Sequence, residues 1–151
     1  MKKPIQRIKV FIDTNVLIAG SVSVTGASAA VLDLCEAESI QMVISRQVLV
    51  EADRNFSTKL PGLVTQFRQF IQNLAPMMVE DPPAMAVERT ATLIDRKDAI
   101  ILAAAIEAKV DYLITLDKKH FIKERVRRNI PIEICTPADF LRIFERLWLQ
   151  D

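Results

Sequence analysis

The chain has 151 residues, with 20 basic and 19 acidic side chains and a net charge of +1, and half of its residues are hydrophobic. This length allows one domain or at most two, and the composition excludes disordered and fibrous proteins. With a net charge near zero, affinity for nucleic acid or an anionic membrane requires a local basic patch. Three glycines and one histidine are too few for a glycine-rich phosphate loop or a zinc site with several histidines.

The first half of the chain alternates short apolar runs with amphipathic segments. A buried strand is predicted over 8–12, where branched apolar residues end at an aspartate. A helix is predicted over 28–38 and a second strand over 40–44. Ser45 is the expected N-cap of the next helix, and a further amphipathic helix covers 61–74.

The second half continues this alternation. The predicted elements are a strand over 77–79, a helix over 84–93, a helix over 99–108, a strand over 112–115 and a strand over 132–134. Asp98 is the expected cap of the helix over 99–108, whose few polar positions predict deep burial. A last helix starts at Thr136 and Pro137, since proline is favoured in the first turn.

Helices that alternate with short apolar strands are typical of a parallel sheet with helices on both faces. We therefore predict an α/β fold with about five strands, in a single domain over 1–151, because no linker or repeat interrupts the chain. Asp13 and Asn15 break the apolar run that follows the basic residues at 2–3, so no secretion signal is expected. No run is long enough to span a membrane, and we expect a cytoplasmic protein.

The two cysteines, Cys35 and Cys135, lie far apart in the sequence and have no metal-binding spacing. Both stand among apolar residues, which is typical of buried cysteines. We expect two free thiols in a reducing compartment.

Four acidic residues are predicted to meet at one edge of the sheet. Asp13 ends the first strand and Asp117 follows the strand over 112–115; in open parallel sheets, functional groups collect beyond the carboxyl ends of the strands. Asp98 opens a crossover helix, which enters from the same edge because it runs antiparallel to its strands. Glu51 lies about two turns into the helix after the second strand, so one face of that helix reaches the same crevice.

Each of these acids also has a purely structural interpretation. Asp13 and Asp117 fit turn or cap positions, Asp98 fits a helix cap, and Glu51 fits an exposed helical face. A purely structural role does not explain why four acids converge, because several carboxylates in one crevice repel one another unless cations lie between them. Carboxylates suit Mg²⁺ or Mn²⁺, and two such ions can hold a phosphodiester and activate a water.

These motifs resemble those of the PIN-domain ribonucleases. The resemblance is carried by the runs over 11–17, 98–105 and 111–117 together with Glu51, so it covers nearly the whole chain. The closer similarity is to the prokaryotic PIN proteins that are the toxin components of toxin–antitoxin pairs.

The resemblance implies a PIN-like three-layer sandwich with an acidic pocket that binds Mg²⁺ or Mn²⁺ and cleaves RNA. It makes Asp13 and Asp98 the central metal ligands. Glu51 and Asp117 then complete the catalytic pocket, partly through water. A small antitoxin protein is the implied partner, and relatives are often homodimers; the apolar residues of the last helix fit either a dimer interface or the core.

The resemblance also assigns supporting residues. Asn15 and Thr115 are expected to orient the metal ligands. Where the family often has a further acid shortly after the fourth, this chain has His120. Its pocket therefore has one carboxylate fewer than the pockets of the family members that are richest in acids. His120 itself fits a surface or cap residue better than a phosphate contact.

A run of basic residues follows Asp117 directly. We call it the basic lip, which consists of Lys118, Lys119, Lys123, Arg125, Arg127 and Arg128. Most charge runs are solvated surface, but a nuclease needs phosphate contacts beside its acidic pocket, and a local cluster supplies them. We therefore expect Lys118, Lys119 and Lys123 to bind RNA, together with Arg96 and Lys97, which flank Asp98.

Two other classes of protein fit part of the pattern. A phosphotransferase or phosphatase with Asp13 as nucleophile usually needs a second acid two residues on, where this chain has Asn15. A non-catalytic PIN-like module that binds RNA or a protein is the alternative, although loss of one of the four acids would be its signal and all four are present. We predict a Mg²⁺- or Mn²⁺-dependent ribonuclease.

Overall fold

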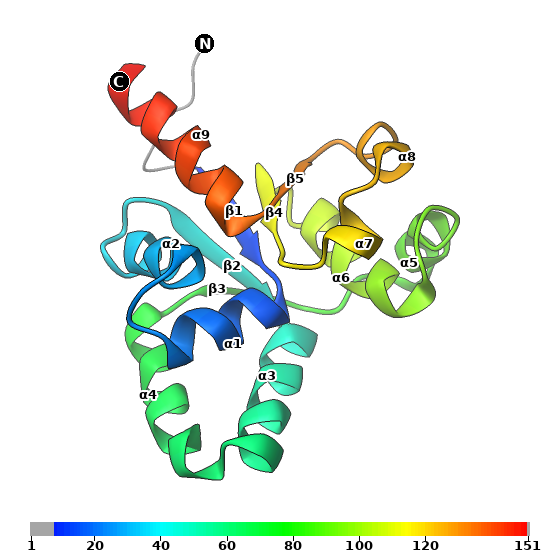
Figure 1. The fold of residues 1–151 in the computed structure, drawn as a ribbon. Coiled ribbons are helices and arrows are strands. Elements are labelled where there is room, and N and C mark those ends of the chain that lie inside the picture. The colour runs from blue at the N-terminus through cyan, green and yellow to red at the C-terminus, as the bar shows by residue number, and fades with distance from the viewer. Residues whose placement is uncertain (1–7, 151) are drawn as a thin grey trace.

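The computed structural model describes residues 8–150, so the basic residues at 2–3 considered above lie outside the described part. Its centre is one sheet of five strands that all pair in parallel, in the order β3-β2-β1-β4-β5 (Figure 1). The strands are β1 (Lys9–Ile12), β2 (Gln41–Ser45), β3 (Met77–Val79), β4 (Tyr112–Ile114) and β5 (Glu133–Cys135).

β1 is the middle strand, and its last three residues, Val10, Phe11 and Ile12, are completely buried. Phe11 pairs with Val43 on one side and with Leu113 on the other, and all three side chains are completely buried. A strand covered on both faces reads as a continuous apolar run. This is why the short strands could be recognised in the sequence.

Helices cover both faces of the sheet. On one side α1 (Thr14–Val22) packs on α2 (Ala27–Glu36), which contacts α9 (Pro137–Gln150), and on the other α5 (Ala84–Thr90) packs on α6 (Arg96–Glu107) (Figure 1). The predicted three-layer α/β sandwich with a five-stranded parallel sheet is therefore confirmed.

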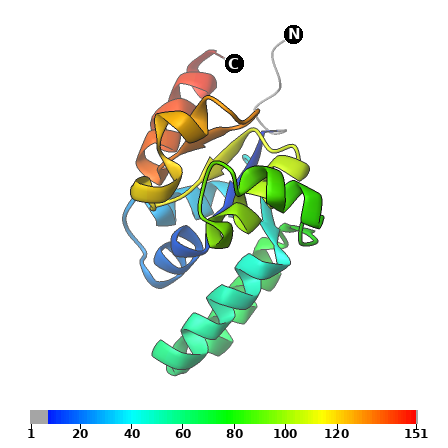
Figure 2. The same ribbon diagram turned by 90° about the vertical axis from the view of Figure 1, so that its right-hand side faces the viewer.

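A helical hairpin projects from the body of the molecule. It consists of α3 (Arg46–Lys59), the short 3₁₀ helix η2 (Pro61–Leu63) and α4 (Val64–Leu74), and Figure 2 shows α3 extending away from the sheet. Its two helices are joined by Phe56 and Phe67, whose rings stack with centroids 4.3 Å apart. Ser45 accepts a hydrogen bond from the amide of Val48, as expected for the N-cap of α3.

The prediction that Asp98 caps a helix over 99–108 is wrong. Helix α6 begins at Arg96, and Asp95 holds the N-cap position, where its carbonyl accepts from the amides of Asp98 and Ala99. Arginine and lysine are good helix formers, so the helix starts one turn earlier than its apolar residues do. Asp98 therefore lies in the first turn of α6.

Other boundaries shift and three helices were not predicted. The helix expected over 28–38 ends at Glu36, and the one expected over 84–93 ends at Thr90. The unpredicted helices are α1, α7 (Lys118–Phe121) and α8 (Glu124–Arg127). The last two are single turns and contain four of the six residues of the basic lip.

Both cysteines are free and buried, as predicted. Burial raises the pKa of Cys35 and of Cys135 to about 12, which keeps both thiols protonated and unreactive. No single helix in residues 8–150 has the length and apolar character needed to cross a membrane, although α1 and α2 together, bent by 90°, meet that criterion.

We predict that Gly20→Ala destabilises the protein, although alanine is the better helix former. A Cβ at this position would lie 2.5 Å from Cδ1 of Leu32 and 2.9 Å from the carbonyl oxygen of Ser28, so α1 and α2 would have to separate. We expect the free energy of unfolding to fall by about 1–3 kcal/mol. Gly62→Ala is the control, because its Cβ would meet nothing within 4 Å. Equal stability of the two variants in urea would contradict the proposed close packing.

Candidate functional site

Asp13 lies at the carboxyl end of β1 and is the most buried acid of the site. Its Oδ2 accepts a hydrogen bond of 2.7 Å from the hydroxyl of Thr115, and its Oδ1 accepts one of 2.8 Å from the amide of Thr14. Asp13 is also the N-cap of α1. Only 7% of its surface is exposed, so these two donors replace most of the water that the carboxylate has lost.

Glu51 approaches Asp13 from α3. Its Oε2 accepts a hydrogen bond of 3.1 Å from the hydroxyl of Thr14, the residue after Asp13, and its Oε1 accepts one from Gln47. Gln47 lies one helical turn before Glu51, a spacing that brings side chains together. The predicted approach of α3 to the crevice is therefore present, and Thr14 and Gln47 are two contacts that the sequence analysis did not identify.

Asp117 and Asp98 meet on the other side of the site, where α6 and α7 come together. Asp117 caps α7 and accepts a hydrogen bond of 3.1 Å from the amide of His120. One ligand atom from each of Asp98, Asp117 and His120 can be chosen so that all three lie within 4.8 Å of one another. His120 thus lies beside two of the acids, at the position where the family resemblance predicts a further acid, and its side chain is partly exposed.

Two further polar residues connect the loop after β4 to β1. Thr115 is completely buried, and its Oγ1 accepts from the amide of Asp117 at 3.0 Å while donating to Asp13. Asn15 accepts from the amide of Leu116 at 3.2 Å through its Oδ1. The loop that carries Asp117 is therefore held against the end of β1.

The charges of the site act on one another. Burial raises the pKa of Asp13 to about 6, and the nearby charges of Asp98 and Glu51 add to the rise, against the hydrogen bonds from Thr115 and Thr14. Burial also raises the pKa of Asp98, with Asp117 adding to the rise and His120 opposing it. Oxygen donors crowded in this way are the ligand set that hard divalent cations prefer, so these residues fit Mg²⁺ or Mn²⁺.

Basic side chains border the acidic group. Lys97, Lys118, Lys119 and Lys123 are exposed, and none of the four forms an ion pair within residues 8–150. A cavity of about 410 Å³ lies beside them, with Arg96, His120, Lys123 and Arg125 in its wall. Arg96 is partly neutralised by Glu88 at 2.7 Å, so the lysines carry most of the free positive charge.

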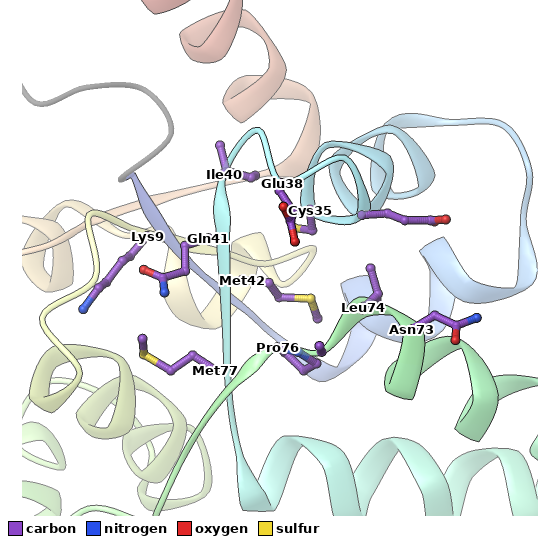
Figure 3. Close-up of a pocket in the computed structure, with 12 residues that line it drawn as sticks. Lys9, Cys35, Glu38, Ile40, Gln41, Met42, Asn73, Leu74, Pro76 and Met77 are labelled. Atoms are coloured by element: carbon purple, nitrogen blue, oxygen red, sulfur yellow. The ribbon is translucent and has the colours of Figure 1, made fainter.

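A larger cavity, of about 900 Å³, lies at the opposite edge of the sheet (Figure 3). Lys9, Gln41 and Met77, which begin β1, β2 and β3, are among the residues that line it. Functional groups of parallel sheets gather at the other, carboxyl edge. The chemistry of the four acids therefore lies away from this cavity.

We predict that the metal-free protein loses stability as the pH rises from 4 to 7. An acid whose pKa is raised by folding binds its proton more tightly in the folded state, so stability falls as that proton leaves. For Asp13 the rise from 3.8 to about 6 corresponds to about 3 kcal/mol.

Asp13→Asn should abolish this contribution, so that the variant gains about 2–2.5 kcal/mol relative to the wild type between pH 4 and pH 7. The comparison uses denaturant unfolding in chelator at each pH, which cancels the contributions of the other acids. If the difference in the free energy of unfolding between the two proteins stayed constant from pH 4 to pH 7, the pKa of Asp13 would not be raised by folding.

Comparisons with known proteins agree with this fold. The PIN domain family model matches residues 9–119, and no curated protein matches the chain.

Among solved structures, the chain is similar to DNA-bound VapBC from Salmonella typhimurium, with a TM-score of 0.65, 18% identity, and 86% of this chain and 98% of that chain covered. VapBC2 from Rickettsia felis, bound to a promoter DNA fragment, has a TM-score of 0.62 at 16% identity, with 85% and 98% covered. PAE2754 from Pyrobaculum aerophilum has a TM-score of 0.62 at 15% identity, with 92% and 90% covered. These likenesses show a shared fold, and together with the family match over most of the sequence they establish that the chain belongs to the PIN domain family.

Proposed function

We propose that this chain is a divalent-metal-dependent endoribonuclease that acts as a single domain over 1–151 and is the toxin of a toxin–antitoxin pair. One observation carries the proposal: four acids from separate elements of a PIN fold converge at one edge of the sheet. The charges of Glu51 and Asp98 help to raise the pKa of Asp13, and Asp98 lies close to Asp117.

We assign to the four acids the roles that the resemblance to the PIN-domain ribonucleases implies. Asp13 and Asp98 are the central metal ligands, and Glu51 and Asp117 complete the pocket, partly through water. The bound Mg²⁺ or Mn²⁺ supplies an activated water and neutralises the charge that develops on the phosphate. The Thr115 hydroxyl holds Oδ2 of Asp13, and Asn15 holds the loop before Asp117, so both act by orienting ligands.

The basic residues provide the affinity for RNA in this proposal. Lys118, Lys119 and Lys123 are joined by Arg96 and Lys97 around the acidic pocket. Phosphates bound by these side chains release counterions, which provides affinity without a high net charge. In this proposal the basic residues bind the RNA, and the four acids hold the metal for the cleavage step.

Partners are proposed from the neighbouring folds. The similar structures include VapBC complexes and FitAcB from Neisseria gonorrhoeae, to which the chain is 17% identical, and we infer a small antitoxin protein as the partner of this cytoplasmic toxin. We also propose a homodimer. On α9 the rings of Phe140, Phe144 and Trp148 contact one another in turn. Phe140 is buried in the core, whereas Trp148 is 58% exposed, so the end of this helix offers an apolar surface to a second copy of the chain.

The central test is metal-dependent cleavage of RNA by the purified protein. We expect single-turnover cleavage with Mg²⁺ or Mn²⁺, none in chelator, and a loss of at least about 100-fold in Asp13→Asn and in Asp98→Asn. Both substitutions keep the side-chain size and remove one charged ligand.

Two controls separate the rival classes. Asp53→Asn removes an acid of α3 that is paired with Arg68 and lies outside the site, and it should leave cleavage unchanged. Hydrolysis of a phosphomonoester by the wild type, with RNA left intact, would favour a phosphatase with Asp13 as nucleophile. A folded protein that binds RNA without cutting it would be the non-catalytic module.

A second prediction concerns the basic lip. Replacing Lys118, Lys119 and Lys123 with alanine should weaken RNA binding and flatten its dependence on salt by about 2–3 in the log–log slope, because fewer counterions are released. Cleavage at saturating RNA should change little, since none of the three lysines holds a metal.

The matched control removes three exposed basic residues from α3 and α9, namely Arg54, Lys59 and Arg146. It has the same net charge as the lip variant and should keep the salt slope of the wild type. A collapse of saturated cleavage with an unchanged salt slope would place the lip in the catalytic machinery.

A further inference from the structure

His120 is the one nitrogen donor among the acids of the site. It follows Asp117 by three residues, so the single turn of α7 brings its ring back over the carboxylate that caps that turn. Nδ1 of His120 lies 3.0 Å from Oδ1 and 2.8 Å from Oδ2 of Asp117. The side chain is 42% exposed and that of Asp117 is 26% exposed, so both can be reached from solvent.

The contact with Asp117 sets the orientation of the imidazole ring. A proton on Nδ1 donates to the carboxylate and leaves the lone pair of Nε2 free. This is the arrangement that metal-binding histidines adopt, in which the ring nitrogen away from the metal donates to a carboxylate or carbonyl. The backbone of His120 is fixed as well, because its amide donates to the same carboxylate at 3.1 Å.

The acids of the site fall into two groups that share Asp98. Asp13 and the half-buried Glu51 form the inner group, in which the charge of Asp98 helps to raise the pKa of Asp13. Asp117 and His120 form the outer group, with ligand atoms within 4.8 Å of Asp98 and of each other. The inner group offers only oxygen, whereas the outer group mixes oxygen with nitrogen.

Resting on the proposed metal-dependent function, we propose that Nε2 of His120 binds the metal together with Asp98 while Asp117 orients the ring, and that this nitrogen makes the site prefer Mn²⁺ to Mg²⁺. Mg²⁺ is bound almost entirely by oxygen. Imidazole is a ligand of transition metals, of which Mn²⁺ is one, whereas Mg²⁺ retains water and carboxylate oxygens. A carboxylate in place of this ring would leave an all-oxygen site, which accepts Mg²⁺ as readily.

The test compares the ratio of Mn²⁺ to Mg²⁺ affinity in the wild type and in His120→Asp at one fixed pH, by titration calorimetry. We expect the ratio to fall by about tenfold or more in the variant. Thr92→Asp is the control, because it adds a carboxylate to the wall of the cavity that His120 also lines without replacing the ring. It should keep the ratio of the wild type. Melting in chelator confirms that each variant is folded.

Pulsed electron paramagnetic resonance of the Mn²⁺-loaded protein provides a direct second readout. Coupling of Mn²⁺ to ¹⁴N should be present in the wild type and lost in both His120→Asp and His120→Asn. A structural role of the ring would not produce this signal.

The outcomes also separate this inference from the proposed function. If both ions bind, Asp98→Asn abolishes binding and the His120 variants keep the wild-type ratio and the nitrogen signal, His120 is not a ligand and only this inference fails. If neither ion binds the wild type, the metal-dependent function fails with it.

Discussion

The hydrogen bond from the Thr115 hydroxyl to Asp13 joins the two central strands where they end, and the rest of the site is arranged around it. A carboxylate as buried as Asp13 is costly without donors. The same hydroxyl accepts from the amide of Asp117, so one oxygen atom links β1, β4 and the loop beyond. Asn15 adds a second link to that loop. Mutual repulsion of the acids is thus opposed by short bonds between neighbouring strands.

Local charge separation explains how a chain with a net charge of +1 can suit a polyanionic substrate. The acids lie in the crevice at the sheet edge, and lysines on α6 and α7 that form no ion pair within residues 8–150 border them. The lysines attract phosphate groups, whereas the carboxylates repel them unless cations lie between the two.

The strands, and the positions of the four acids relative to them, were accessible from the sequence because apolar runs of this kind end at the carboxyl edge of a parallel sheet. Helix α1 was missed because its apolar residues, Val16 to Ala19, show no helical period. Helices α7 and α8 are single turns, too short for any period. The start of α6 was misplaced because Asp95 and Asp98 are equally good caps by composition. The contact of His120 with Asp117 was not predicted, because it depends on the turn of α7.

The strand order also determines when the site can exist during synthesis. β1 is the first strand, yet its partner β4 comes more than 100 residues later: the bond between Asp13 and Thr115 spans 102 positions. A ribosome adds about 5–20 residues per second, so the first acid waits several seconds for the strand that completes its surroundings. Until then Asp13 remains hydrated and Asp98 has no neighbour in Asp117. A nascent or truncated chain that stops before β4 therefore carries three of the four acids but lacks both the Thr115 hydroxyl and the Asp117 carboxylate that complete the site.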